Sequence, residues 1–348
     1  MIDDMSRSVW AALVAALLLL AGITGGVVAT STTAAAAPPG QLVTVRAATS
    51  ASTAATLTLW TRLADGSYRR DYGPVTAHVG AAGVGVTREG ISRTPAGVFG
   101  LTQAFGNQAS NGTRLPYLRA GVNDWWDENP ASPTYNRHVV RATSPGGASE
   151  NLYRAGSAYA HAVVINYNMN PVVRGAGSGF FLHVSVGTAT AGCVSVPSGQ
   201  LDTIMRWLNP ASRPVISIGV GAAATATVDT ANAAVLRARA AHNPIGHVDS
   251  LGAVAGRSAV RISGWAIDPD NRSAQLTVGM HVDGHPWGHS FTGVARPDVA
   301  RIKGAGPRQG FAFELNVPKG AHRICLLAGN IGIGTGNPTL GCRVVTVT

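Results

Sequence analysis

Cys193 is the residue of this chain best suited to covalent chemistry. It follows His183 along the chain, and the stretch between them contains Gly187 and Gly192. A thiol is mostly protonated near neutral pH, so a nucleophilic cysteine needs a base such as histidine beside it. The small residues of this stretch allow the chain to return so that both side chains meet, and Gly192 leaves room for an acyl substrate. The pair predicts acyl transfer, with Cys193 as nucleophile and His183 as base.

The other two cysteines predict a disulfide. Cys325 and Cys342 flank the glycine-rich segment 329–336, and each lies in a sequence typical of a strand. Two neighbouring strands can be joined by a disulfide, and in an exported protein an odd number of cysteines leaves one thiol over. Cys193 is distant from both in sequence. We therefore expect it to be the free thiol.

The N-terminal segment 1–37 is typical of a secretory signal peptide. Arg7 precedes the apolar run 9–28, and small residues up to Ala37 provide a cleavage site. An uncleaved membrane anchor is the alternative, because the run approaches the length that spans a bilayer. We expect a secreted protein of the cell wall or another extracytoplasmic site, with transient membrane contact only through this segment.

The chain is basic, with 27 Lys and Arg against 17 Asp and Glu. A basic exported protein meets anionic partners, here anionic cell-wall polymers. Arg69 and Arg70 are the only adjacent pair of arginines, and no nucleic-acid motif accompanies the others, so no nucleic acid is expected. His138 and His161 lack the spacing of metal ligands, and we expect neither a metal nor a cofactor.

Short β segments dominate the expected first domain, residues 42–220. Segments typical of strands lie within 43–63, 75–86, 94–99, 162–165, 179–183 and 215–220, and a hairpin turn is expected at 64–67. Residues 106–150 are polar and predict loops. Apolar residues recur at three and four positions between 198 and 208, which predicts a short helix after Cys193, with Ser198 as N-cap and Pro210 as its stop.

The sequence changes in character after residue 220. Residues 221–243 are rich in alanine and predict a linker that is either irregular or helical. From 244 to 348 short alternating strands recur, for example at 260–265 and 311–315, which predicts a small Ig-like β-sandwich. This domain is expected to bind wall polymer or to act as a spacer.

Residues 42–219 resemble the catalytic domain of YkuD-type L,D-transpeptidases, the ErfK/YbiS group. The matching segments are Thr94–Phe99, Gly177–His183 and Thr190–Val194. The resemblance implies a β-rich catalytic domain whose cysteine attacks a peptidoglycan stem tetrapeptide and expels its terminal D-alanine. An amine of a neighbouring stem then resolves the thioester into a 3–3 crosslink. With water as acceptor, the protein is instead an L,D-carboxypeptidase or a cysteine amidase.

Two positions depart from the better-known members of this family. Those members carry Ser-His-Gly-Cys and an arginine two places after the cysteine, whereas this chain has Ala191 and Ser195 there. The resemblance therefore implies the nucleophile and the base, but it leaves open the contact with the substrate carboxylate and the geometry of the loop between them. A non-catalytic wall-binding protein is therefore a further alternative.

Several polar and aromatic residues are candidates for contact with a stem peptide, the expected partner. They are Ser185, Thr190, Tyr167, Trp125, Tyr135 and Asn136. Trp125 is equally well explained as part of a loop over a hydrophobic face. Tyr135, Asn136 and Tyr167 also suit a role in holding loops through side-chain hydrogen bonds. The group that orients His183 is expected to be a backbone carbonyl or Ser185.

Overall fold

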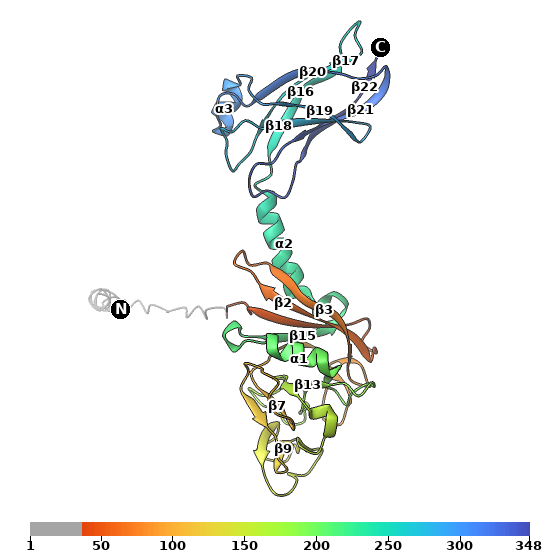
Figure 1. Cartoon of the computed structure of the whole chain (residues 1–348), viewed down its shortest axis with the longest axis vertical. Coiled ribbons are helices and arrows are strands. Elements are labelled where there is room, and N and C mark those ends of the chain that lie inside the picture. Colours follow the sequence, from red (N-terminus) through yellow and green to blue (C-terminus); the bar gives the residue numbers. More distant parts are fainter. Residues whose placement is uncertain (1–36) are drawn as a thin grey trace, which may run out of the picture. The chain divides into compact units, whose positions relative to one another are not determined.

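The structure, a computed structural model, describes residues 37–348 (Figure 1). The predicted signal peptide therefore lies, apart from its last residue, outside the described residues. The described part is mostly β, which confirms the expected fold class. None of its helices is long and apolar enough to cross a membrane.

A ten-stranded sheet organises the first part of the chain. Its strands are β1 (Gln41–Ala47), β2 (Ala54–Arg62), β3 (Tyr68–His78), β6 (Gly97–Gly100), β7 (Ala104–Gly106), β8 (Tyr117–Arg119), β12 (Ala162–Val164), β13 (Phe181–Val184), β14 (Val194–Val196) and β15 (Val215–Val220). They follow the order β6-β15-β1-β2-β3-β14-β13-β12-β7-β8. The pairs β1–β15, β13–β14 and β7–β8 are parallel, and the others are antiparallel. A separate pair joins β4 (Val84–Gly85) to β5 (Thr94–Pro95).

The predicted helix is α1 (Ser198–Trp207), which packs against this sheet (Figure 1). Its apolar face is formed by Leu201, Ile204 and Met205, which are fully buried in the core with the strands. The predicted N-cap is wrong by one residue. Pro197 holds that position, because its extended backbone ends β14 and its carbonyl accepts the first helical hydrogen bonds.

A small sheet occupies the region that the sequence predicts as loops. It consists of β10 (Arg137–Val140), β9 (Asp124–Asp127) and β11 (Glu150–Asn151), in that order. Strands of two to four residues are too short to show alternation, so the sequence carries no periodic signal for them. In β9, Trp126 is buried and its ring meets that of Phe181 edge-on at 5.1 Å. The small sheet thus covers one face of β13.

The alanine-rich segment is helical. It forms α2 (Ala226–Ala240), which packs on the first part of the chain through Val228, buried with Leu42 and Tyr68. The Asn232 amide also bonds both backbone groups of Tyr68, at 2.6 and 3.1 Å. Short 3₁₀ turns lie at η1 (Gly156–Tyr159), η2 (Pro210–Ser212) and η3 (Gly221–Ala224). The domain boundaries at 220 and 244 stay a prediction.

The C-terminal part is a β-sandwich (Figure 1). One sheet has the order β16-β17-β20 and the other β19-β18-β21-β22. The elements are β16 (Ile245–Ala253), β17 (Ala259–Ile267), β18 (Thr277–Val282), β19 (His285–Phe291), α3 (Pro297–Lys303), β20 (Gly310–Asn316), β21 (Gly320–Ala328) and β22 (Thr339–Val347). Ile262, Met280 and Leu326 are fully buried in one core that both sheets share, which is the packing of a sandwich.

The predicted disulfide joins β21 to β22. Cys325 and Cys342 are paired across the two strands and bonded to each other, and Cys193 is free. The bond closes a loop with a sequence separation of 17. Closing a loop of this size restricts the unfolded chain and stabilises the fold by about 3 kcal/mol.

We expect the double variant Cys325→Ser/Cys342→Ser to lose about 3 kcal/mol in the free energy of unfolding of the sandwich, because its unfolded chain regains the freedom of the open loop. Denaturant unfolding with and without reductant measures this. The reductant should destabilise the wild type and leave the double variant unchanged. Equal stability of the two proteins without reductant would contradict the expectation.

Candidate active site

The parallel pair β13–β14 positions the two residues with predicted chemical roles. Leu182 faces Val194 across the pair, and His183 faces Ser195. Leu182 and Val194 point into the main core, while Phe181 and Cys193 belong to a second buried cluster. Because side chains alternate along a strand, His183 lies on the same face as Phe181. His183 and Cys193 therefore share one face of the sheet on neighbouring chain segments.

The Cys193 thiol is buried and held by backbone groups. The Phe181 N–H donates to Sγ at 3.3 Å, and Sγ donates to the Gly179 carbonyl at 3.4 Å. The carbonyl of Cys193 accepts from the hydroxyls of Thr190 and Thr94, at 2.6 and 3.3 Å. These contacts fix the turn that ends at Cys193, and Thr190 acts on this turn rather than on the pocket.

Gly192 is required by the same turn. Its φ is +145°, and a Cβ added there would lie 2.7 Å from the ring of Phe180. An alanine at this position would displace the ring, which lines the pocket beside the thiol. The absent side chain of Gly192 is thus needed by the Phe180 ring, and room for an acyl substrate beside Cys193 stays a prediction.

His183 is oriented by a backbone carbonyl. Its Nδ1 lies 2.9 Å from the carbonyl of Val184, which can only accept, so Nδ1 carries a proton; the carbonyl of Ala158 also interacts with the ring. Ser185, the alternative orienting group, instead bonds His78 at 3.0 Å. Between Cys193 and His183 the described part of the chain shows no hydrogen bond, and the role of His183 as base stays a prediction.

The charges around the thiol favour its neutral form. Burial raises the pKa of Cys193 well above its usual range, and the carboxylates of Glu150 and Glu128 raise it further, against the opposing hydrogen bonds of the Phe181 N–H and the Tyr159 hydroxyl. Burial also lowers the pKa of His183, with a smaller opposing effect of backbone carbonyls. The pair therefore rests as thiol and neutral imidazole near neutral pH, and proton transfer must accompany attack by sulfur.

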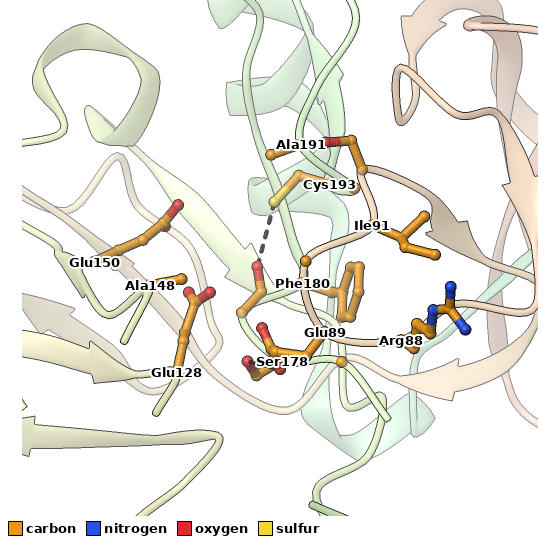
Figure 2. Close-up of a pocket in the computed structure, with 15 residues that line it drawn as sticks. Arg88, Glu89, Ile91, Glu128, Ala148, Glu150, Ser178, Phe180, Ala191 and Cys193 are labelled. Carbon is orange, nitrogen blue, oxygen red and sulfur yellow. Dashed lines mark hydrogen bonds between the residues drawn. The ribbon is translucent and has the colours of Figure 1, made fainter. Parts of the chain in front are cut away.

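A pocket of about 200 Å³ opens onto Cys193 (Figure 2). Its lining consists of Arg88, Glu89, Gly90, Ile91, Ser92, Glu128, Ala148, Glu150, Gly177, Ser178, Gly179, Phe180, Ala191, Gly192 and Cys193. Figure 2 shows the carboxyl groups of Glu128 and Glu150 close to each other on one side and the Arg88 guanidinium on the other. These two carboxyl groups and the guanidinium thus lie on different sides of the pocket.

Tyr135 and Asn136 form hydrogen bonds to residues that line this pocket. The Tyr135 hydroxyl donates to Glu89. Asn136 has a positive φ of 60°, and its Oδ1 accepts from the N–H of Gly179 at 3.2 Å and from Trp126 at 3.0 Å. Both residues therefore hold groups that line the pocket, in agreement with the loop-holding alternative.

Two other candidate residues lie outside this lining. Tyr167 donates its hydroxyl to the carbonyl of Ala176 at 2.8 Å and meets the ring of Phe180 edge-on at 5.1 Å. Trp125 donates to the carbonyl of Arg141 at 3.1 Å, within the small sheet. Contact of either residue with a stem peptide stays a prediction.

Tyr159 and the three pocket glutamates were not among the predicted site residues. The Tyr159 ring meets the His183 ring edge-on at 5.5 Å, and its hydroxyl donates to Glu150 and interacts with the thiol of Cys193. Nothing in the sequence near Tyr159 marks it.

Ser195 stands where better-known family members carry arginine. It is 1% exposed, and within the described residues its Oγ has no hydrogen-bond partner. A residue this deeply buried does not reach a substrate carboxylate in the pocket. Arg88, the basic residue of the lining, is the side chain available for that contact.

We expect Glu150→Gln to lower the pKa of Cys193, because it removes a carboxylate that disfavours the thiolate. At a fixed alkaline pH more of the thiol is ionised, so the pH profile of alkylation by iodoacetamide should shift to lower pH. Glu314→Gln, which removes a carboxylate paired with Arg257 and Arg261 in the sandwich, is the matched control. A profile equal to that of the control would contradict the electrostatic account.

Comparison with known proteins bears on the same part of the chain. The family model described as the YkuD L,D-transpeptidase catalytic domain matches residues 50–216. The comparison with curated proteins gives no match. The matched range contains the whole pocket, His183 and Cys193, and it agrees with the resemblance of residues 42–219. The chain therefore contains a YkuD-type L,D-transpeptidase catalytic domain.

Proposed function

We propose that the protein is an L,D-transpeptidase that forms 3–3 crosslinks in peptidoglycan, with Cys193 as its nucleophile. The observation that carries this proposal is a free cysteine in the wall of a pocket, inside a YkuD domain. A catalytic thiol must be reached by substrate and must not be consumed in a disulfide; the pocket at Cys193 and its free thiol support this role.

The first step forms a thioester. As Sγ attacks the carbonyl of the third stem residue, Nε2 of His183 takes the thiol proton. The bond from this carbonyl to the nitrogen of the terminal D-alanine breaks, and the departing amine receives the proton from His183. The neutral resting pair suits this order, because a neutral imidazole can take up the proton.

The second step transfers the acyl group. An amine of a neighbouring stem attacks the thioester, a new amide bond forms, and the bond to sulfur breaks. The proton lost by the amine passes through His183 to the leaving sulfur, which restores the starting state. With water in place of the amine the same steps give carboxypeptidase or amidase activity, and the products identify the acceptor.

Arg88 supports a stem peptide as the substrate. The leaving D-alanine carries a carboxylate, and a guanidinium binds such a group with two parallel hydrogen bonds. Arg88 lines the pocket on the side away from Glu128 and Glu150 (Figure 2). We also propose that the protein acts outside the cytoplasm, since its disulfide fits an oxidising compartment.

Cys193→Ala should abolish covalent acylation while the protein still folds. The substitution removes only the sulfur from a buried cluster that other residues dominate. Intact-mass analysis after incubation with a disaccharide-tetrapeptide measures the thioester, and circular dichroism checks the fold. A folded variant that forms crosslinks as fast as wild type would refute the proposed nucleophile.

His183→Ala should lose most acylation at neutral pH and recover part of it at alkaline pH, where the thiol ionises without a base. Because burial and nearby carboxylates raise the pKa of Cys193, the recovery should require a pH above the usual range of a thiol. His161→Ala is the matched control, since His161 bonds Asp202 and the Ala109 carbonyl outside the pocket. Equal rates for His183→Ala and this control at neutral pH would exclude His183 as the base.

A further inference from the structure

Three carboxyl groups surround the approach to Cys193. Glu89, Glu128 and Glu150 come from segments far apart in sequence and line one pocket (Figure 2). The chain as a whole carries a net charge of +10, so this acidic site is not a consequence of its overall composition. Folding brings three carboxyl groups into the pocket that opens onto Cys193, and two of them, Glu150 and Glu128, raise the pKa of its thiol.

Two of the three carboxyl groups accept hydrogen bonds from tyrosine hydroxyls, whereas one oxygen of the third has no partner among the described residues. Glu89 accepts a hydrogen bond from Tyr135, and Glu150 accepts one from Tyr159. Glu128 is only 8% exposed, and its Oε1 has no hydrogen-bond partner in residues 37–348. A buried carboxyl group without a partner is unfavourable. Glu128 therefore points to a group that the protein itself does not supply.

The missing partner of Glu128 is a hydrogen-bond donor with positive charge. Burial and the nearby carboxylates of Glu150, Glu89 and Asp127 raise the pKa of Glu128 to about 9. Near neutral pH the group consequently holds a proton in the empty pocket. A cation that enters the pocket takes the place of this proton, because it satisfies the carboxylate and reduces the repulsion among the three glutamates.

The protein's own basic side chain does not fill this role. No ion pair in the described residues joins Arg88 to any of the three glutamates, and Figure 2 shows its guanidinium on the other side of the pocket. In the same residues, no group of three His, Cys, Asp or Glu side chains is arranged to hold a metal ion. A primary ammonium group, with three N–H donors, fits a set of carboxylate acceptors.

The position of Glu128 places this cation close to the reacting sulfur. A Cβ added to Gly179 would lie 2.1 Å from Oε1 of Glu128, so the carboxyl group lies directly against this glycine. The carbonyl of the same Gly179 accepts from Sγ of Cys193 at 3.4 Å. Gly179 thus lies against both the carboxyl group of Glu128 and the thiol of Cys193. A ligand held by Glu128 belongs to the molecule that the thiol attacks or to the one that attacks the thioester.

We propose that Glu128, with Glu89 and Glu150, binds a primary ammonium group of a stem peptide and thereby selects the substrate. This inference rests on the proposed function. The ammonium comes either from the side chain of the donor's third residue, a diamino acid whose carbonyl Cys193 attacks, or from the acceptor amine. Both sources present the same chemistry to the carboxylates. They act in different steps, which can be measured separately.

The first arm of the test measures thioester formation without an acceptor. The wild-type protein is incubated with a disaccharide-tetrapeptide that carries a free side-chain amine at position three, or with the same compound acetylated on that amine. If the donor supplies the ammonium, acetylation should slow acylation by about 10- to 100-fold. This factor corresponds to the free energy of a hydrogen bond to a charged group. This comparison needs no variant, so it does not depend on how a variant folds.

The second arm uses Glu128→Gln, which keeps the shape of the side chain and removes its charge. For an ammonium from the donor, this variant should acylate slowly and at the same rate with both donors. For an ammonium from the acceptor, it should acylate normally but transfer the acyl group to an added amine about 10- to 100-fold more slowly. Glu314→Gln, in the sandwich, should match wild type in both steps.

A penem without a basic side chain separates this inference from the proposed function. It acylates an active thiol without offering an ammonium group, so Glu128→Gln should label at least as fast as wild type, because the substitution removes a carboxyl group that raises the pKa of Cys193. If it labels neither protein at Cys193, the proposed nucleophile fails. If it labels both, but neither acetylation nor Glu128→Gln slows either step, the ammonium site is refuted. The ammonium site is also refuted if Glu128→Gln lowers the acylation rates of the free and the acetylated donor by the same factor relative to wild type, since that result indicates a purely structural role.

Discussion

The backbone hydrogen bonds between the parallel strands β13 and β14 are the constraint on which the site depends. They set His183 opposite Ser195 and place Cys193 immediately before β14, on the face that carries Phe181. A slip of one residue in this pairing would turn the thiol into the main core, because side chains alternate between the two faces. The small sheet and α1 cover opposite faces of β13, and this packing holds the register.

The groups around Cys193 hold the thiol in its protonated form, which is the less reactive one. Burial and two carboxylates keep Cys193 protonated, and burial keeps His183 neutral. A neutral thiol resists oxidation and unwanted alkylation. The cost is a weaker nucleophile in the empty site. Bound positive charge offsets that cost, because it reduces the negative field at sulfur just when the substrate is in place.

Local patterns in the sequence predict much of the fold and the two central residues. The spacing of Leu201, Ile204 and Met205 by three and four positions predicts α1. The distance of Cys193 in sequence from the other two cysteines predicts that its thiol is free. The small sheet escapes prediction because its strands, of two to four residues, are too short to show a clear alternation. The orienting group of His183 is predicted only as a backbone carbonyl or Ser185, and the sequence cannot identify Val184, because every residue possesses a carbonyl.

The pocket charges could not be predicted because they depend on contacts between distant segments. Glu128 and Glu150 are ordinary polar residues in sequence, and only the pairing of β9 with β11 brings the second one near the first. Gly179 completes the arrangement: its φ of +66° turns its carbonyl toward Sγ, and its missing side chain leaves space for the Glu128 carboxyl group. The carbonyl of Gly179 therefore contacts the thiol, and its Cα, which carries no side chain, lies next to the Glu128 carboxyl group. Any side chain at this position would separate the acidic group from the chemistry that it is placed to influence.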